Sequence, residues 1–252
     1  MKNCFAKLPE NYKLVYEINA KNKKTGIIMN LVAALPAILF AVIALLTKDL
    51  SEVPAVSSKD LILAGVKLIC FAISMLAYII LHELTHGAAY KILTGAKLKF
   101  GLSWSCAFCG VPEVYVNKKT ALIALSAPLI LFGIVFAALS VLFWFFDPLL
   151  YIFAMILLGL HLGGCSGDIY MIYLLCFKYN SPSLLLNDDG PSQRIFYPDE
   201  KYIKPDGEKE NKNEQPVRVI GIFGEGVNKN EIKKSENAAE KSATIEETPE
   251  NK

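Results

Sequence analysis

Histidine is scarce in this 252-residue chain, which has only three, and the cysteines follow no pattern typical of a disulfide-bonded domain. The six cysteines are scattered, which excludes a disulfide framework. No internal repeat is present, and the net charge of +2 predicts no nucleic-acid partner. A cleavable signal peptide is not expected, because the first apolar block begins too far into the chain and no small-residue cleavage site follows it.

Apolar residues are abundant instead: they make up 53% of the chain, lie in long blocks and give a positive mean hydropathy. Four blocks approach or exceed the roughly 20 residues that cross a bilayer as a helix. They predict an all-α integral membrane protein with four transmembrane helices, at residues 26–47, 61–90, 120–146 and 149–176. Only Asp147 and Pro148 separate the last two, so a tight helical hairpin is expected there.

Lysines are distributed unevenly around these blocks. They are frequent in residues 1–25 and 91–119, whereas the loop after the first block has only Lys48 and Lys59, among acidic residues. Because cytoplasmic loops carry an excess of basic residues, this bias predicts that both termini and the 91–119 stretch are cytoplasmic. The expected location is the cell membrane, with the chain crossing the lipid bilayer several times.

The transmembrane helices are expected to form a core at residues 26–180, flanked by segments of different character. Residues 1–25 are predicted to be an amphipathic cytoplasmic lead-in, and residues 181–204 a juxtamembrane segment. Residues 205–252 are rich in Lys, Glu and Asn, which is typical of a disordered tail. The chain is thus expected to end in a disordered cytoplasmic tail.

One part of the core has the pattern of β-structure. Apolar and polar residues alternate from Ala96 to Trp104, which is the period of a strand. Val114 and Val116 are expected to form the return strand, with Gly110 and Pro112 near the turn. The sequence therefore predicts a membrane-associated β-hairpin at residues 95–117.

The motif with the clearest chemical meaning is His82-Glu83-Leu84-Thr85-His86, near the end of the second block. On a helix, histidines four residues apart lie on one face, where both imidazoles can bind one Zn²⁺. Glu83 lies beside them in the position of a general base that deprotonates a zinc-bound water. The alternative is a His–Glu pair that only hydrogen-bonds within a helical bundle. The metal interpretation is favoured, because all three histidines and a lone intramembrane Asp fall in two segments.

A catalytic zinc site usually has three protein ligands, and the fourth block contains two candidates for the third, His161 and Asp168. A charge inside a membrane segment is costly, so Asp168 is a functional candidate. Counted from the outer ends of their blocks, His82 and Asp168 both lie roughly 30 Å along a helix, at matching depth. His161 lies about 10 Å deeper. Asp168 is therefore the predicted ligand, and His161 the predicted oxyanion stabiliser or supporting group, with a satisfied core histidine as its alternative.

A second pattern, Cys106-Ala-Phe-Cys109, is less specific. Such a pair can be redox-active or bind metal, but one pair without partners is weak. The two cysteines are interpreted as small apolar residues of the hairpin.

Together these residues resemble a family of membrane zincins, the domain of unknown function DUF3267, related in plan to the site-2 proteases. The likeness covers about residues 8–200, including the HELTHG stretch at 82–87, the GAKLKFG stretch at 95–101, Ala127-Pro128 and Gly167-Asp168. It implies a membrane zinc metallopeptidase in which His82, His86 and Asp168 bind zinc and Glu83 is the base. The site-2 proteases have an Asn-Pro motif before their liganding Asp, and His161 stands near that place here.

The function expected from the sequence is hydrolysis of a membrane-protein or peptide substrate at the cytoplasmic boundary of the membrane. A second hypothesis is a non-catalytic scaffold, or pseudo-protease, that recruits a partner through its tail. A small metal-ion or proton transporter is disfavoured, because four helices without an inverted repeat do not fit such folds. The oligomeric state is left open.

Overall fold

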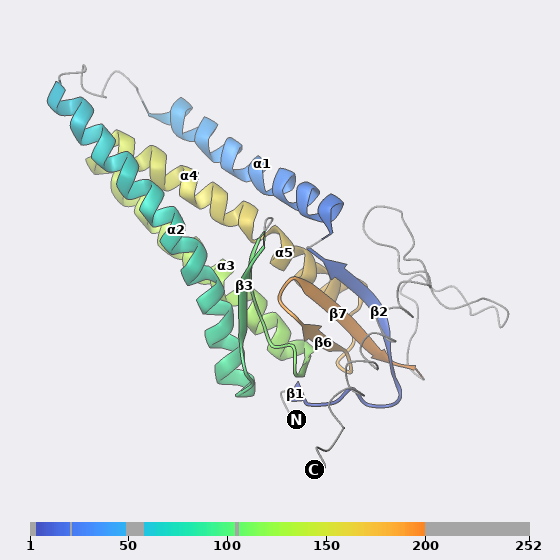
Figure 1. Ribbon diagram of the computed structural model, residues 1–252. Helices are drawn as coiled ribbons and strands as arrows, with labels where there is room; N and C mark the ends of the chain where they lie inside the picture. Colours follow the sequence, from blue (N-terminus) through green and yellow to red (C-terminus); the bar gives the residue numbers. More distant parts are fainter. Residues whose placement is uncertain (1–3, 21, 49–57, 104–105, 200–252) are drawn as a thin grey trace, which may run out of the picture.

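The computed structural model describes residues 4–20, 22–48, 58–103 and 106–199. Long helices extend to one side, and small sheets gather at one end of them, where the described parts of both terminal regions also lie (Figure 1). The predicted disordered tail at 205–252 lies outside the described residues. The helices are α1 (Lys23–Thr47), α2 (Ser58–Thr94), α3 (Lys118–Phe146), α4 (Pro148–Gly164), α5 (Ser166–Tyr173) and the π-helical turn η2 (Leu174–Lys178).

Three of these helices, α1, α2 and α3, are long and apolar enough to cross a membrane. The fourth candidate span is broken: α4 and the segment Ser166–Lys178 meet at a bend of 42°. Large apolar side chains cover the outer surface, and Leu61 and Leu76 of α2 are 64% and 65% exposed. An apolar surface of this extent is unfavourable in water but ordinary against lipid, so the helices are compatible with a membrane protein.

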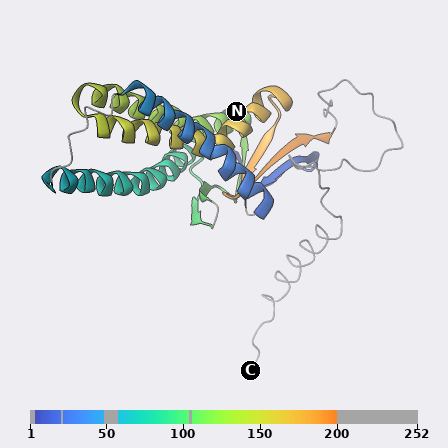
Figure 2. The same cartoon turned by 90° about the horizontal axis from the view of Figure 1, so that it is seen from above.

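Close contact between α1 and α4 depends on glycine. A Cβ atom at Gly159 would lie 2.7 Å from the carbonyl oxygen of Pro36, and one at Gly163 would overlap the backbone of Ala33. The two backbones therefore approach as small-residue helix interfaces allow. On the other side, α2 packs mainly along α3 and is set apart from α1 over much of its length (Figure 2).

Asp147 alone connects α3 to α4 and has two roles at this turn. Its Oδ1 accepts a hydrogen bond from the backbone N–H of Leu150 at 2.9 Å, which caps the start of α4. Its other carboxylate oxygen forms an ion pair with Lys67 of α2, and both side chains are largely shielded from solvent. The helical hairpin is thereby joined to α2 at the end far from the sheets.

We expect Asp147→Ala to lower the free energy of unfolding by about 1–3 kcal/mol, because it removes both the helix cap and the ion pair. Asp147→Asn keeps a capping oxygen and should lose less. Thermal unfolding of both variants in detergent, followed by circular dichroism, checks the difference. Equal losses in the two variants would show that the cap contributes nothing.

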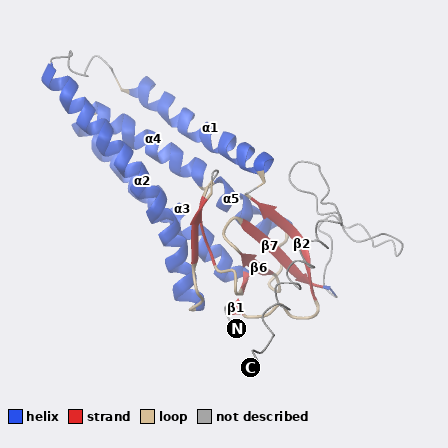
Figure 3. Ribbon diagram, viewed as in Figure 1, coloured by secondary structure: helices blue, strands red, loops and turns tan. Residues whose placement is uncertain are grey.

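Five strands form an antiparallel sheet in the order β1-β5-β6-β7-β2 (Figure 3). Its members come from three distant parts of the chain: β1 (Cys4–Phe5), β2 (Tyr12–Asn19), β5 (Tyr115–Asn117), β6 (Leu185–Asp188) and β7 (Ser192–Pro198). One core cluster joins this sheet to the helix ends, with Tyr90, Leu125, Met171 and Leu186 almost fully buried. The sheet therefore fixes the positions of α2, α3 and α5 at the end where they meet.

The expectation of an all-α fold is corrected: the fold is mostly helical with a small antiparallel sheet. Local periodicity missed this sheet, because its strands are short and pair with segments far away in the sequence. Strand β2 lies within the predicted lead-in, and β6 and β7 lie within the predicted juxtamembrane segment.

The hairpin between α2 and α3 also differs from its predicted form. It consists of β3 (Lys99–Leu102) and β4 (Ala107–Gly110), paired from Lys99–Gly110 to Leu102–Ala107. Val116, expected in the return strand, belongs to β5 of the larger sheet instead. The hairpin packs against α2 at Gly87, where a Cβ atom would lie 2.8 Å from the Phe100 ring. The same Cβ atom would lie 3.2 Å from Sγ of Cys109, so β4 also packs against α2 at the residue that follows His86.

Candidate metal centre

The two motif histidines lie on one buried face of α2. They are four residues apart, and only 8% of His82 and 7% of His86 is exposed. Between them, the Thr85 hydroxyl donates a hydrogen bond to the carbonyl oxygen of Leu81, at 2.8 Å. The helix therefore presents two imidazoles side by side, as the spacing predicts.

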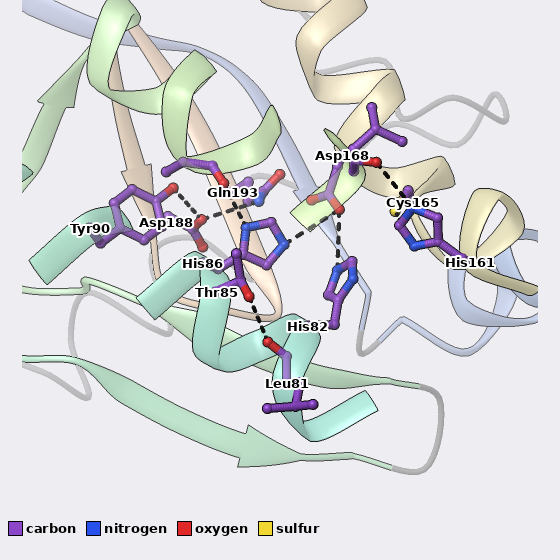
Figure 4. Close-up of polar contacts among 12 residues, drawn as sticks. Leu81, His82, Thr85, His86, Tyr90, His161, Cys165, Asp168, Asp188 and Gln193 are labelled. Atoms are coloured by element: carbon purple, nitrogen blue, oxygen red, sulfur yellow. Dashed lines mark hydrogen bonds and ion pairs between the residues drawn. The ribbon is translucent and has the colours of Figure 1, made fainter. Parts of the chain in front are cut away.

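Asp168 reaches these histidines from a different helix. It lies in the first turn of α5, directly after the break that separates α5 from α4. Its Oδ2 lies 3.5 Å from Nε2 of His82 and 3.4 Å from Nε2 of His86 (Figure 4). Three side chains predicted as metal ligands thus converge on one point.

The spacing of these three atoms fits a zinc ion. Two ligands that are each about 2.0–2.1 Å from a tetrahedral zinc lie about 3.4 Å apart. The observed separations of 3.4 and 3.5 Å match that edge, and two imidazole nitrogens with one carboxylate oxygen form a common catalytic donor set. Two of the three ligand-to-ligand distances thus suit zinc, and all three ligand atoms lie within 4.8 Å of one another.

Glu83 lies next to the ligand group and is half-buried. Its carboxylate accepts a hydrogen bond from the backbone N–H of Cys109 in β4. The hairpin therefore orients the side chain that the motif predicts as general base.

Two hollows meet at this position. The first, of about 230 Å³, lies between α1 and α2 and is lined by Met29, Ala33, Tyr78, His82 and Glu83 among others. The second, of about 140 Å³, lies between the hairpin and the β6–β7 turn and also contains His82 and Glu83, together with His86, Asp168 and Asp188. An extended chain passing through both hollows would run beside the candidate metal position.

A family model described as "Putative zincin peptidase", DUF3267, matches residues 75–182. This part of the chain is similar to that family. The match confirms the resemblance, and it covers α2 from Met75, the hairpin, α3, α4 and α5. Searches of curated proteins and of solved structures gave no match. A zincin peptidase is a hydrolase that uses zinc, so family and donor set agree on the metal.

His161 lies beside His82 but is not in the group formed by His82, His86 and Asp168. It is fully buried, and its ring centroid is 6.4 Å from that of His82. Its Nε2 lies 3.1 Å from the carbonyl oxygen of Leu129, and its Nδ1 lies 2.9 Å from the hydroxyl of Tyr78. Both ring nitrogens thus have hydrogen-bonding partners within the protein. The oxyanion role expected from the sequence stays a prediction.

Sequence reasoning missed a second acidic residue beside the candidate metal centre. Asp188 is buried at the end of β6 and accepts hydrogen bonds from Tyr90 Oη at 2.8 Å, Gly190 N at 2.9 Å and Gln193 Nε2 at 3.2 Å. Figure 4 shows this group on the far side of His86 from Asp168. Burial raises the pKa of Asp188 to about 6, although the hydrogen bonds oppose the shift. Its signal in the sequence is only an Asp-Asp-Gly turn, which is typical of any hairpin.

Cys106 and Cys109 are thiols that form no disulfide bond, like the other four cysteines. Cys106 lies at the hairpin turn with its Sγ 3.3 Å from the Ser103 hydroxyl, whereas Cys109 is buried. Burial raises the pKa of the Cys109 thiol to about 12, so it is protonated and unreactive at neutral pH. This agrees with their interpretation as packing residues.

Proposed function

We propose that this protein is an integral membrane zinc metallopeptidase that hydrolyses peptide bonds near the cytoplasmic boundary of the membrane. The observation that carries the proposal is that Asp168 Oδ2 lies 3.5 Å from Nε2 of His82 and 3.4 Å from Nε2 of His86, with Glu83 beside them. The family match to zincin peptidases supports the same chemistry. The apolar surface of the helices supports the membrane setting.

The chemistry is divided between the metal and the chain. A bound zinc would polarise the scissile carbonyl and lower the pKa of water toward neutrality. His82, His86 and Asp168 would hold it on three sides. Glu83 would take the proton from the attacking water and deliver it to the leaving amine. The N–H of Cys109 keeps the Glu83 carboxylate turned toward this position.

Substrate binding is proposed to involve the hairpin. A peptide bond in an intact helix is shielded, so the substrate must be extended before water can attack it. Strand addition to the β3–β4 hairpin would satisfy the backbone groups of an extended substrate in an apolar setting. The hairpin is suited to this because β4 touches Glu83 and contributes Ala107 to both hollows.

The sidedness of the protein is proposed from the lysines. The sheets, the hairpin and the residues around 91–119 lie at one end of the helices (Figure 1). An excess of lysine there supports a cytoplasmic position for this end. The scaffold alternative depended on the tail, which lies outside the described residues, and no contact of the described residues favours it.

Removal of the metal tests the proposal directly. The protein purified in detergent is expected to contain about one zinc per chain, because three ligands with water complete a catalytic site. Cleavage of a reconstituted single-span membrane peptide, followed by mass spectrometry, should stop with a chelator and return with added zinc. A wild-type protein that binds no zinc would refute the proposed function.

A further inference from the structure

The two metal-binding histidines are held in place by different partners at their second ring nitrogens. A histidine that binds metal through one nitrogen almost always donates its other N–H to an acceptor, which fixes the tautomer and the orientation of the ring. In both histidines the nitrogen facing Asp168 is Nε2, so the orienting contact falls on Nδ1. The structure supplies one partner for each Nδ1.

For His86 the partner is the carbonyl oxygen of Ala124 in α3, at 2.9 Å in a buried position. A carbonyl only accepts, so Nδ1 must carry the proton, and Nε2 is left with its lone pair for a metal. Ala124 would normally accept from the N–H of the residue four positions later. That residue is Pro128, which lies inside α3 and has no N–H. The proline therefore leaves this carbonyl free for the histidine.

For His82 the partner is the hydroxyl of Tyr78, one turn earlier on α2, 3.3 Å from Nδ1. The same hydroxyl lies 2.9 Å from Nδ1 of His161 and forms a hydrogen bond with the thiol of Cys165. His82, His161 and Cys165 have the donor types of a second metal site. The Tyr78 hydroxyl bonds to all three, however, so they surround a hydroxyl group and do not need an ion.

The donor and acceptor of each hydrogen bond can be assigned by starting from His161, whose second nitrogen faces a carbonyl. His161 Nε2 faces the carbonyl oxygen of Leu129, so it must donate, and neutral His161 then accepts at Nδ1. Two possible donors face this nitrogen, the Tyr78 hydroxyl at 2.9 Å and the Cys165 thiol at 3.6 Å. A thiol is a weak donor, so the nearer hydroxyl donates to His161, and its oxygen can accept from Nδ1 of His82. His82 is left with an Nε2 lone pair directed at the candidate metal position.

We propose that α3 sets the tautomers of both metal-binding histidines: that of His86 directly, through the carbonyl that Pro128 leaves free, and that of His82 through Tyr78 and His161. Tyr78, His161 and Pro128 are positioning residues, since none of them is in the ligand group. The inference rests on the proposed function only in that the site holds zinc. It does not depend on which substrate is cleaved.

The principal test compares Tyr78→Phe with the wild-type protein. The variant keeps the ring, which packs against Phe132 and Phe136 with centroids 5.4 and 5.2 Å away, and removes only the hydroxyl. Zinc affinity, measured by chelator competition, should fall by about 10- to 100-fold. The visible spectrum of the Co²⁺-substituted protein should change as well, because the His82 ring is no longer fixed. Tyr151→Phe is the matched control. The Tyr151 hydroxyl lies 3.0 Å from that of Thr47, where α1 ends and α4 begins, at the end of the helices far from the sheets.

The two other positioning residues have variants that separate orientation from packing. His161→Asn keeps an acceptor on the same Cγ as Nδ1 and should retain more zinc affinity than His161→Leu, which lacks one. Pro128→Ala restores an N–H that competes for the Ala124 carbonyl, and we expect zinc affinity to fall by about tenfold. Pro36→Ala in α1 is its control, because Pro36 also lies inside a helix but away from the site.

The outcomes distinguish this inference from the proposed function. Wild-type zinc affinity and an unchanged Co²⁺ spectrum in Tyr78→Phe would overturn the inference and leave the peptidase proposal intact. An equal loss of affinity in Tyr151→Phe would also overturn it, because the effect would then be general loosening. A wild-type protein that binds zinc but cleaves no substrate would count against the peptidase alone.

Discussion

Glu83→Gln is expected to reduce peptide hydrolysis by about 100- to 10,000-fold, the usual contribution of a positioned general acid–base. The amide is nearly the same size as the carboxylate but cannot take a proton from water. Zinc content should stay at the wild-type level, because Glu83 is not one of the three converging ligand side chains. Turnover and metal content are measured on the same purified sample.

The matched control is Glu113→Gln, which removes an exposed carboxylate at the same end of the molecule. It should change neither zinc content nor turnover. Retained cleavage in Glu83→Gln would remove Glu83 from the mechanism, and loss of zinc in that variant would mean that Glu83 acts as a ligand.

Asp168→Asn is expected to weaken zinc binding by roughly 100- to 1,000-fold. Structural zinc sites release about 10–16 kcal/mol on binding, which shared among four ligands is about 2.5–4 kcal/mol each. The amide has the shape of the carboxylate but lacks its charge and is a poor zinc ligand. Metal analysis after dialysis against a weak chelator measures the change, and turnover should fall with the zinc content.

Two comparisons make the Asp168 result specific. Asp189→Asn breaks the ion pair of Asp189 with Lys99, which is 2.7 Å long, and should leave zinc binding unchanged. Alanine variants of His82 and His86 should lose zinc as Asp168→Asn does, whereas His161→Ala should lose less. If zinc content depended on His161 and not on Asp168, His161 would be the third ligand in place of Asp168.

The arrangement of the site was predictable from the sequence because it depends on depth along helices. His82 and Asp168 lie at the same distance along their apolar blocks, and a rise of about 1.5 Å per residue converts that count into a common height. The structure brings their ligand atoms to 3.5 Å. Depth does not fix rotation about the helix axis, however, and the bend between α4 and α5 is what turns Asp168 toward the histidines.

The sheet and the hydrogen-bonding partners of the histidines could not be predicted in the same way. Strand β1 pairs with β5, and β2 pairs with β7, so that Cys4 faces Val116 and Tyr12 faces Pro198. No local period carries information on such pairing. The sequence does indicate the position of Tyr78, which lies four residues before His82 and therefore on the same face of the helix. It also indicates a free carbonyl at Ala124, because Pro128 inside a helix has no N–H to donate to the carbonyl four residues earlier.

The ion pair between Lys67 and Asp147 has a consequence for the register of the helices. Lys67 lies fifteen residues before His82 on the same helix, which is about 22 Å along its axis. The helix α2 thus contacts the α3–α4–α5 segment at two heights: at Asp147, through Lys67, and at Asp168, through the two histidines. A slide of α2 by even one residue would break both attachments together. The pair therefore helps to fix the height of the two histidines on α2 relative to that of Asp168 on α5.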